Sequence, residues 1–178
     1  MGFGATARAF ANKERDELTM LTEQGVQVAG NAFSQVLVIK GVPGEAETSG
    51  APLLSGADGK ALRAAFAKLG YAPEDWCGLA CWRTDGGMLE PTQLRLAVTV
   101  LDPSTIVACD EVASSLVCAA YAEDLLMLGG VLEPGNVAMV AGMRVLGLGG
   151  FEAALADMQS KQVMWARLKR IPPLGDPY

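Results

Sequence analysis

The chain contains no histidine among its 178 residues. Imidazole is the usual general acid or base near neutral pH, and it is a common ligand of zinc. Catalytic mechanisms and metal sites that depend on an imidazole are therefore excluded.

Long apolar runs and a surplus of basic residues are also absent. Apolar residues make up 51% of the chain, but no uninterrupted run approaches the roughly 20 residues that a membrane-spanning helix needs. The chain has 20 acidic and 14 basic residues, which gives a formal charge of -6. Because a negative field repels phosphate backbones, we expect weak or no binding of nucleic acid, and we expect no membrane segment.

Cysteine is scarce, and none precedes Cys77. The spacing of Cys77 and Cys81 is that of half a metal site, but the chain offers neither a histidine nor a second close pair. Charged residues interrupt the first 24 residues, which therefore lack the apolar stretch of a secretory signal. We expect a cytoplasmic protein whose cysteines, including Cys109 and Cys118, are free, buried thiols without a metal.

Short β-branched runs alternate with amphipathic segments along the chain. This alternation predicts a single domain over 1–178 with a three-layer α/β/α fold and a central, mostly parallel four-stranded sheet. Strands are expected over 35–40, 75–82, 105–109 and 136–141, with a short extended piece over 143–148. Helices are expected within 1–24, over 58–69 with Asp58 as its cap, over 92–101, and from about 111, 151 and 160; an irregular tail covers 172–178.

The loop after the first strand is the first place to look for a ligand site, because open parallel sheets bind ligands beyond the carboxyl ends of their strands. The loop over 41–47 has neither a phosphate-loop nor a dinucleotide-binding spacing. Glu45 and Glu47 within it either form a pair of carboxylates for acid–base chemistry or are solvated and cap a turn. Asp110 and Glu111 are interpreted as an acidic pair at a helix N-terminus.

A basic stretch lies near the C-terminus, at Lys161, Arg167, Lys169 and Arg170. These side chains either contact phosphate or complement the dipole at the end of a helix, and we favour the second interpretation. The apolar positions of the helix over 58–69 are spaced at three and four residues, which predicts a core face rather than a cofactor site.

The segment VLVIKGVPGEAETSGAPLLSGADGKALRAAF resembles the first motif of the iron–sulfur, family-4-type uracil-DNA glycosylases. Pro43, Gly44, Glu45 and Glu47 match the Pro-Gly-Glu-x-Glu core of that motif. Further similar segments follow in the family's order at 50–53, 56–59, 71–75, 81–83, 106–109 and 153–168, so that the resemblance covers roughly residues 35–171.

The departures from the family fall at its chemical groups. Gly41, or less favourably Lys40, stands in place of the acidic residue, Leu53 in place of the base-stacking aromatic residue, and Cys77 or Gly78 in place of the asparagine that reads uracil. The histidine motif is missing from 143–151. The cluster cysteines are also missing, with at most Cys81 retained, so we expect no iron–sulfur cluster and no other cofactor.

The resemblance therefore implies a non-catalytic uracil-DNA glycosylase-like protein with a binding or interaction role and no catalytic residues. Two alternatives stay open: a divergent glycosylase that removes uracil or another damaged base, and a small-molecule or redox protein on the same fold that uses pocket cysteines and glutamates. The predicted ligand-binding residues are Gly41, Val42, Pro43, Gly44, Glu45, Glu47, Leu53 and Gly78.

Overall fold

A six-stranded sheet forms the centre of the computed structural model, which describes residues 3–126 and 132–172. The strand order is β1-β3-β2-β4-β6-β5, in which β3, β2, β4 and β6 are mutually parallel and the two edge strands are antiparallel to their neighbours. The strands are β1 (Val28–Gly30), β2 (Val36–Lys40), β3 (Trp76–Ala80), β4 (Thr105–Ala108), β5 (Val137–Val140) and β6 (Met143–Gly147). The predicted α/β class is confirmed, but the sheet has six strands rather than four.

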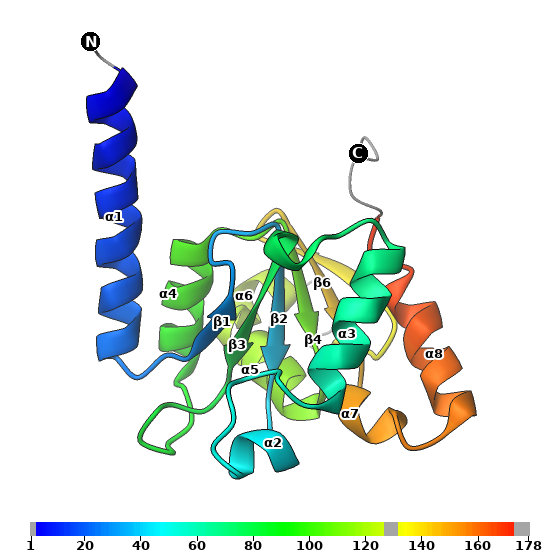
Figure 1. Ribbon diagram of the computed structural model, residues 1–178. Helices are drawn as coiled ribbons and strands as arrows, with labels where there is room; N and C mark the ends of the chain where they lie inside the picture. The colour runs from blue at the N-terminus through cyan, green and yellow to red at the C-terminus, as the bar shows by residue number, and fades with distance from the viewer. Residues whose placement is uncertain (1–2, 127–131, 173–178) are drawn as a thin grey trace.

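Helices cover both faces of this sheet (Figure 1). They are α1 (Phe3–Glu23), α2 (Glu45–Thr48), α3 (Ala57–Lys68), α4 (Pro91–Leu101), α5 (Glu111–Ala120), α6 (Ala122–Leu125), α7 (Phe151–Ala154) and α8 (Met158–Leu168), with a 3-10 turn over Pro73–Asp75. Within the described residues, no helix is long and apolar enough to cross a membrane.

The alternation of side chains along β2 divides the core into two clusters. Leu37 and Ile39 pack with α4, α5 and the end of α1, whereas Val36 and Val38 pack with α3, α7 and α8. Every residue of β2 is buried, as is typical of a parallel strand that is covered on both faces. The next residue in the alternation, Lys40, therefore points to the α3 side of the sheet.

The predicted fourth core strand is wrong in its position. The segment 136–141 contains β5, which is largely exposed and forms an antiparallel edge, and the supposed short piece over 143–148 is β6, which pairs parallel to β4. The reason is the turn between them: Ala141 and Gly142 both have positive φ angles, of 48° and 83°. Two such residues form a tight hairpin, so the strands they join must be antiparallel.

Two further differences concern short elements and the cap of α3. The edge strand β1 has only three residues and the helix α2 only four, and neither has the length of apolar pattern that would predict it. Gly56, rather than Asp58, is the N-cap of α3, and Asp58 is buried within the first turn of the helix. The predicted irregular tail lies outside the described residues except for Pro172, whose carbonyl accepts a hydrogen bond from the Tyr71 hydroxyl.

The strand order places a switch point between β2 and β4. The connection from β2 runs through α3 to β3 on one side, whereas the connection from β4 runs through α5 toward β6 on the other side. Connections that diverge in this way leave a crevice beyond the carboxyl ends of the two strands.

Candidate functional site

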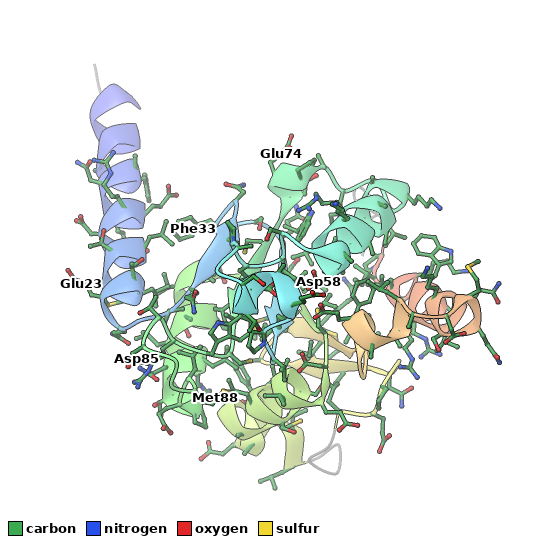
Figure 2. All side chains as sticks on the ribbon, turned by 60° about the horizontal axis from the view of Figure 1, so that its bottom comes forward. Glu23, Phe33, Asp58, Glu74, Asp85 and Met88 are labelled. Atoms are coloured by element: carbon green, nitrogen blue, oxygen red, sulfur yellow. The ribbon has the colours of Figure 1, made fainter. Side chains whose placement is uncertain are left out.

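A pocket of about 380 Å³ lies at this switch point. Its walls come from the loop after β2, the start of α3, the end of β4 and the residues after β6; they are Lys40, Val42, Pro43, Asp58, Cys109, Asp110, Gly150, Phe151, Glu152 and Ala153. Figure 2 turns this edge of the sheet toward the viewer and shows Asp58 beside α2. The pocket combines apolar walls with several charged groups.

The Lys40 ammonium group is the centre of these charges. Its Nζ atom lies 2.5 Å from Asp58 Oδ2, 3.0 Å from both carboxylate oxygens of Glu47, and 3.0 Å from Glu152 Oε2. The side chains of Lys40, Glu47 and Asp58 are 3%, 5% and 3% exposed, whereas that of Glu152 is 42% exposed. Since an ammonium group has three protons, three carboxylates use its full donor capacity.

These contacts fix the charge of Lys40. Burial alone would lower the pKa of the lysine, but hydrogen bonds to Asp58, Glu47 and Glu152 outweigh burial and raise the pKa well above its ordinary value. Burial alone would likewise raise the pKa of Glu47, but the Lys40 ammonium and the Leu54 N–H lower it. Lys40 therefore stays protonated near neutral pH and is neither a base nor a nucleophile.

Glu47 also fixes the loop that follows β2. Its carboxylate accepts hydrogen bonds from the backbone N–H groups of Gly44 and Leu54, each at 2.9 Å. The first of these bonds closes the short helix α2, and the second ties α2 to the segment before α3. Of the two alternatives for Glu47, the capping of a turn accounts for its bonds to backbone N–H groups, but the carboxylate is buried on Lys40 rather than solvated.

Asp110 fixes the start of the same loop from the other side. One carboxylate oxygen accepts from the N–H groups of Gly41 and Val42, at 2.9 and 3.3 Å, and the other accepts from the Ala113 N–H at 2.9 Å, as an N-cap of α5. The loop passes so close to α5 that a Cβ atom at position 41 would overlap Asp110 and the Ala113 backbone. Only glycine fits there.

Glu152 closes the pocket from α7. Its carboxylate reaches Lys40 across the loop, and a Cβ atom at Gly44 would overlap it. Three carboxylates therefore contact one ammonium group, and a fourth, that of Asp110, lines the same pocket. The pocket carries a net negative charge, which favours a cationic or uncharged ligand over an anion.

The cysteines near the site are poor nucleophiles. Burial raises the pKa of the Cys81 thiol to about 12, with a smaller contribution from Asp110, and it raises the pKa values of Cys77 and Cys109 as well. All four cysteines are free, and Cys118 is partly exposed rather than buried. In the part of the chain that the structure describes, no three potential ligands are grouped as a metal site would require.

The predicted ligand-binding residues fall into four groups. Val42 and Pro43 line the pocket, and Gly41, Gly44 and Glu47 form the loop behind it. Glu45 is exposed at the start of α2.

Leu53 and Gly78 lie outside the pocket. They are next to the side chain of Leu54, which packs so closely on Gly78 that a Cβ atom there would meet Leu54 Cδ1 at 2.5 Å.

Asp58 and Glu152 are the site residues that the sequence did not reveal. One signal was present: a lysine at the end of a fully buried strand needs counter-charges, because an unpaired buried ammonium group is very costly. The position of the lysine at a strand end does not say which carboxylates supply these counter-charges. Glu152 follows a different strand, and nothing in its local sequence distinguishes it from an ordinary acidic residue in the first turn of a helix.

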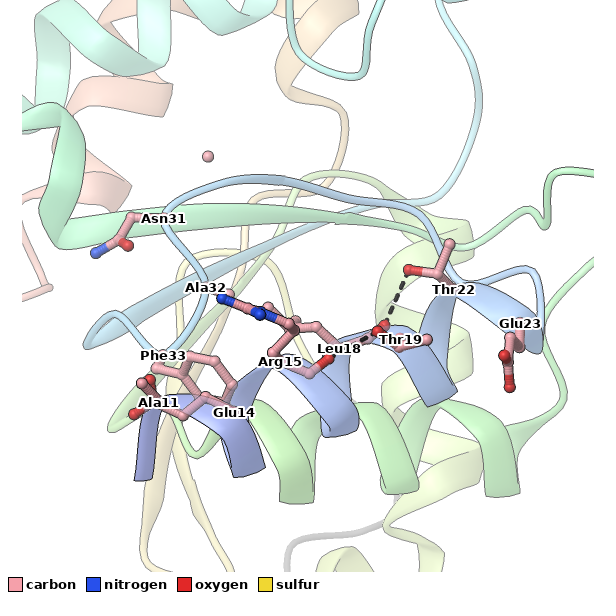
Figure 3. A pocket seen from close by; sticks show the side chains of 11 residues that line it. Ala11, Glu14, Arg15, Leu18, Thr19, Thr22, Glu23, Asn31, Ala32 and Phe33 are labelled. Atoms are coloured by element: carbon pink, nitrogen blue, oxygen red, sulfur yellow. Dashed lines mark hydrogen bonds between the residues drawn. The ribbon is translucent and has the colours of Figure 1, made fainter. Parts of the chain in front are cut away.

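A wider cleft of about 710 Å³ lies elsewhere, between α1 and the segment after β1 (Figure 3). Its polar side chains, such as Glu14, Arg15 and Asn31, are exposed, and two of its threonines bond to carbonyls of their own helix. We assign the candidate site to the smaller pocket, because that pocket gathers buried charges at the strand ends.

Comparison with models of known protein families yields no match, and no curated protein matches the chain.

Proposed function

We propose that this chain is a non-catalytic member of the uracil-DNA glycosylase superfamily that binds a small uncharged or cationic ligand in the switch-point pocket. The Pro-Gly-Glu-x-Glu loop, the order of the similar segments and the α/β sheet support the superfamily relationship. The arrangement of charge in the pocket supports the binding role.

The observation that carries the proposal is that all three hydrogen-bond donors of the Lys40 ammonium group are already used by carboxylates. Cleavage of an N-glycosidic bond leaves negative charge on the departing base, and a hydrogen-bond donor or a cation must stabilise that charge in the transition state. Of the described residues that line the pocket, Lys40 alone carries a positive charge, and Asp58, Glu47 and Glu152 already accept hydrogen bonds from its ammonium protons. The carboxylates would destabilise an anionic leaving group rather than stabilise it.

Packing and charge also argue against a flipped base. Leu54 covers Gly78, and Leu53 offers no aromatic face on which a base could stack. The acidic groups Asp110 and Glu152 at the pocket and the net charge of -6 repel a phosphate backbone. A small ligand without phosphate groups meets neither obstacle.

Release of uracil tests the absence of catalysis. Purified protein in excess is incubated with single-stranded and duplex DNA that contains one uracil, and abasic sites are detected by alkaline strand cleavage. We expect no cleavage above that of protein-free DNA. Abasic sites that form with the native chain and disappear in Glu152→Gln, but persist in the exposed loop control Glu45→Gln, would overturn the proposal.

A further inference from the structure

A third depression lies on the α3 and α8 side of the molecule, separated from the switch-point pocket by α7. It is a groove of about 300 Å³ between α3 and α8, and Figure 1 shows the two helices side by side. Phe151, Met164 and Leu168, which are nearly fully buried, form its apolar floor. Ala61, Ala64 and Ala65 form the wall on α3, and their small side chains leave the groove open.

The rim of this groove is basic in a chain that is otherwise acidic. Residues 57–70 and 157–171 hold seven of the 14 lysines and arginines but only two acidic residues, the buried Asp58 and Asp157, which is the N-cap of α8. Lys68 and Lys161 line the groove, and Lys169 lies next to it. Among the described residues, none of these three lysines lies within ion-pair distance of a carboxylate, although hydrogen bonds at the start of α8 and, to a smaller extent, the charge of Lys161 lower the pKa of Asp157.

Trp165 keeps two of these charges beside the groove. The ammonium groups of Lys68 and Lys169 each lie over its ring, 5.8 Å from the ring centroid. Contacts of this kind are attractive because the face of an indole ring is negative. They also occupy the ring that a nucleic-acid base would need for stacking.

We propose that this groove docks an acidic amphipathic helix of a partner protein. The apolar face of such a helix fills the floor between α3 and α8, and its carboxylates pair with Lys68, Lys161 and Lys169. The volume is at the lower end of the roughly 300–1,000 Å³ of small-molecule pockets, which suits a few anchoring side chains better than a cofactor. Charge complementarity identifies the partner as acidic.

The same features disfavour other occupants. A membrane-binding face presents protruding apolar side chains, whereas the apolar groups here lie at the bottom of a groove. A nucleic acid would find charge at the rim but no free aromatic face. The groove is also independent of the ligand proposed for the switch-point pocket, so either proposal can fail without the other.

Fluorescence anisotropy with a panel of labelled peptides tests the docking. Each peptide has about 18 residues, which is long enough for a helix, with leucines spaced at three and four and glutamates elsewhere. We expect micromolar binding that weakens at least tenfold in Lys68→Glu/Lys161→Glu and in Ala64→Leu, which fills the groove. Lys60→Glu is the matched control, because Lys60 is an exposed lysine of α3 that does not line the groove; it should bind as the native chain does.

Several results would overturn the proposal. These are no binding across the panel, equal binding of peptides whose leucines are replaced by serine, or binding that the groove variants leave unchanged. Two other probes are vesicles that contain phosphatidylserine and, separately, single-stranded oligonucleotides. Neither should bind more weakly to Lys68→Glu/Lys161→Glu than to the native chain. Weaker binding of either probe to the double variant would assign the surface to a lipid or a nucleic acid. A stable dimer in sedimentation that this double variant dissociates would assign it to a second copy of the chain.

Discussion

Replacement of Lys40 by methionine should destabilise the fold by leaving two buried carboxylates without their cation. The side chains of Glu47 and Asp58 are 5% and 3% exposed, so neither can turn to water without local rearrangement. Removing one partner of a buried ion pair costs about 3–5 kcal/mol. Glu152 is more exposed and contributes little, because it can be solvated once Lys40 is gone.

The loss of stability in Lys40→Met should depend on pH, and it should become smaller as the pH falls. In the native chain the pKa of Glu47 is lowered, so its stabilisation is present above the unfolded value of about 4.3 and is lost as the pH falls through the folded value. In the variant, burial raises the pKa of Glu47 once Lys40 no longer opposes it, so the folded state takes up a proton as the pH falls. Both effects make the difference in unfolding free energy between the native chain and Lys40→Met smaller toward low pH.

Urea unfolding followed by circular dichroism at neutral pH and at about pH 5 measures the difference. A partner variant sharpens the test: Asp58→Asn should destabilise the native chain, because it removes one carboxylate from Lys40. The same change should stabilise Lys40→Met, because it removes an unpaired charge. Two results would refute the reasoning. One is a loss of stability below about 1 kcal/mol for Lys40→Met at neutral pH, and the other is an Asp58→Asn change that does not stabilise Lys40→Met.

Three further outcomes follow from the same contacts. Gly41→Ala should lower the free energy of unfolding in urea by more than about 2 kcal/mol, since a Cβ atom there overlaps Asp110. Gly50→Ala has open space around it and should cost only about 1 kcal/mol, for its positive φ. Equal losses of stability would contradict the close packing at position 41. A thiol reagent at neutral pH should modify Cys118 promptly and the other three cysteines only on unfolding, and prompt modification of more than one thiol would contradict their burial. The raised pKa of Lys40 adds stability that is complete below the unfolded pKa of about 10.4 and is lost as the pH rises through the folded pKa. The difference in unfolding free energy between the native chain and Lys40→Met should therefore shrink in strong alkali. A difference that does not change with pH there would contradict this dependence.

The sequence predicts three of the central strands well and the remaining strands poorly, for a physical reason. β2, β3 and β4 are short, fully buried apolar runs, and such runs are typical of parallel strands. The roles of β5 and β6 depend instead on the turn at Ala141 and Gly142. Alanine is not a typical residue at positive φ, so nothing in the local sequence announces the hairpin.

The candidate site likewise has parts that the sequence predicts and parts that it does not. The loop over 41–47 could be predicted as part of the site because its position after the first core strand follows from topology. The position of Asp110 at a helix N-terminus could also be predicted. Its bond to the Gly41 N–H, and the ion pairs of Asp58 and Glu152 with Lys40, could not, because each of these contacts depends on a partner far away in the sequence. Pairing of distant charges is a property of the folded arrangement rather than of spacing.

The charge preference of the switch-point pocket is tested most directly by ligands that differ only in charge. Benzylamine, benzyl alcohol and benzoate have nearly the same size, and nuclear magnetic resonance titration compares their binding to the native chain. Ala153→Phe blocks the pocket from an exposed position, and Ala156→Phe is the control outside it.

We predict that benzylamine and benzyl alcohol shift resonances of residues that line the pocket, that benzoate does not, and that Ala153→Phe abolishes these shifts while Ala156→Phe retains them. Benzoate that binds in the pocket as tightly as benzylamine would contradict the claim that Asp58, Glu47 and Glu152 use up the charge of Lys40.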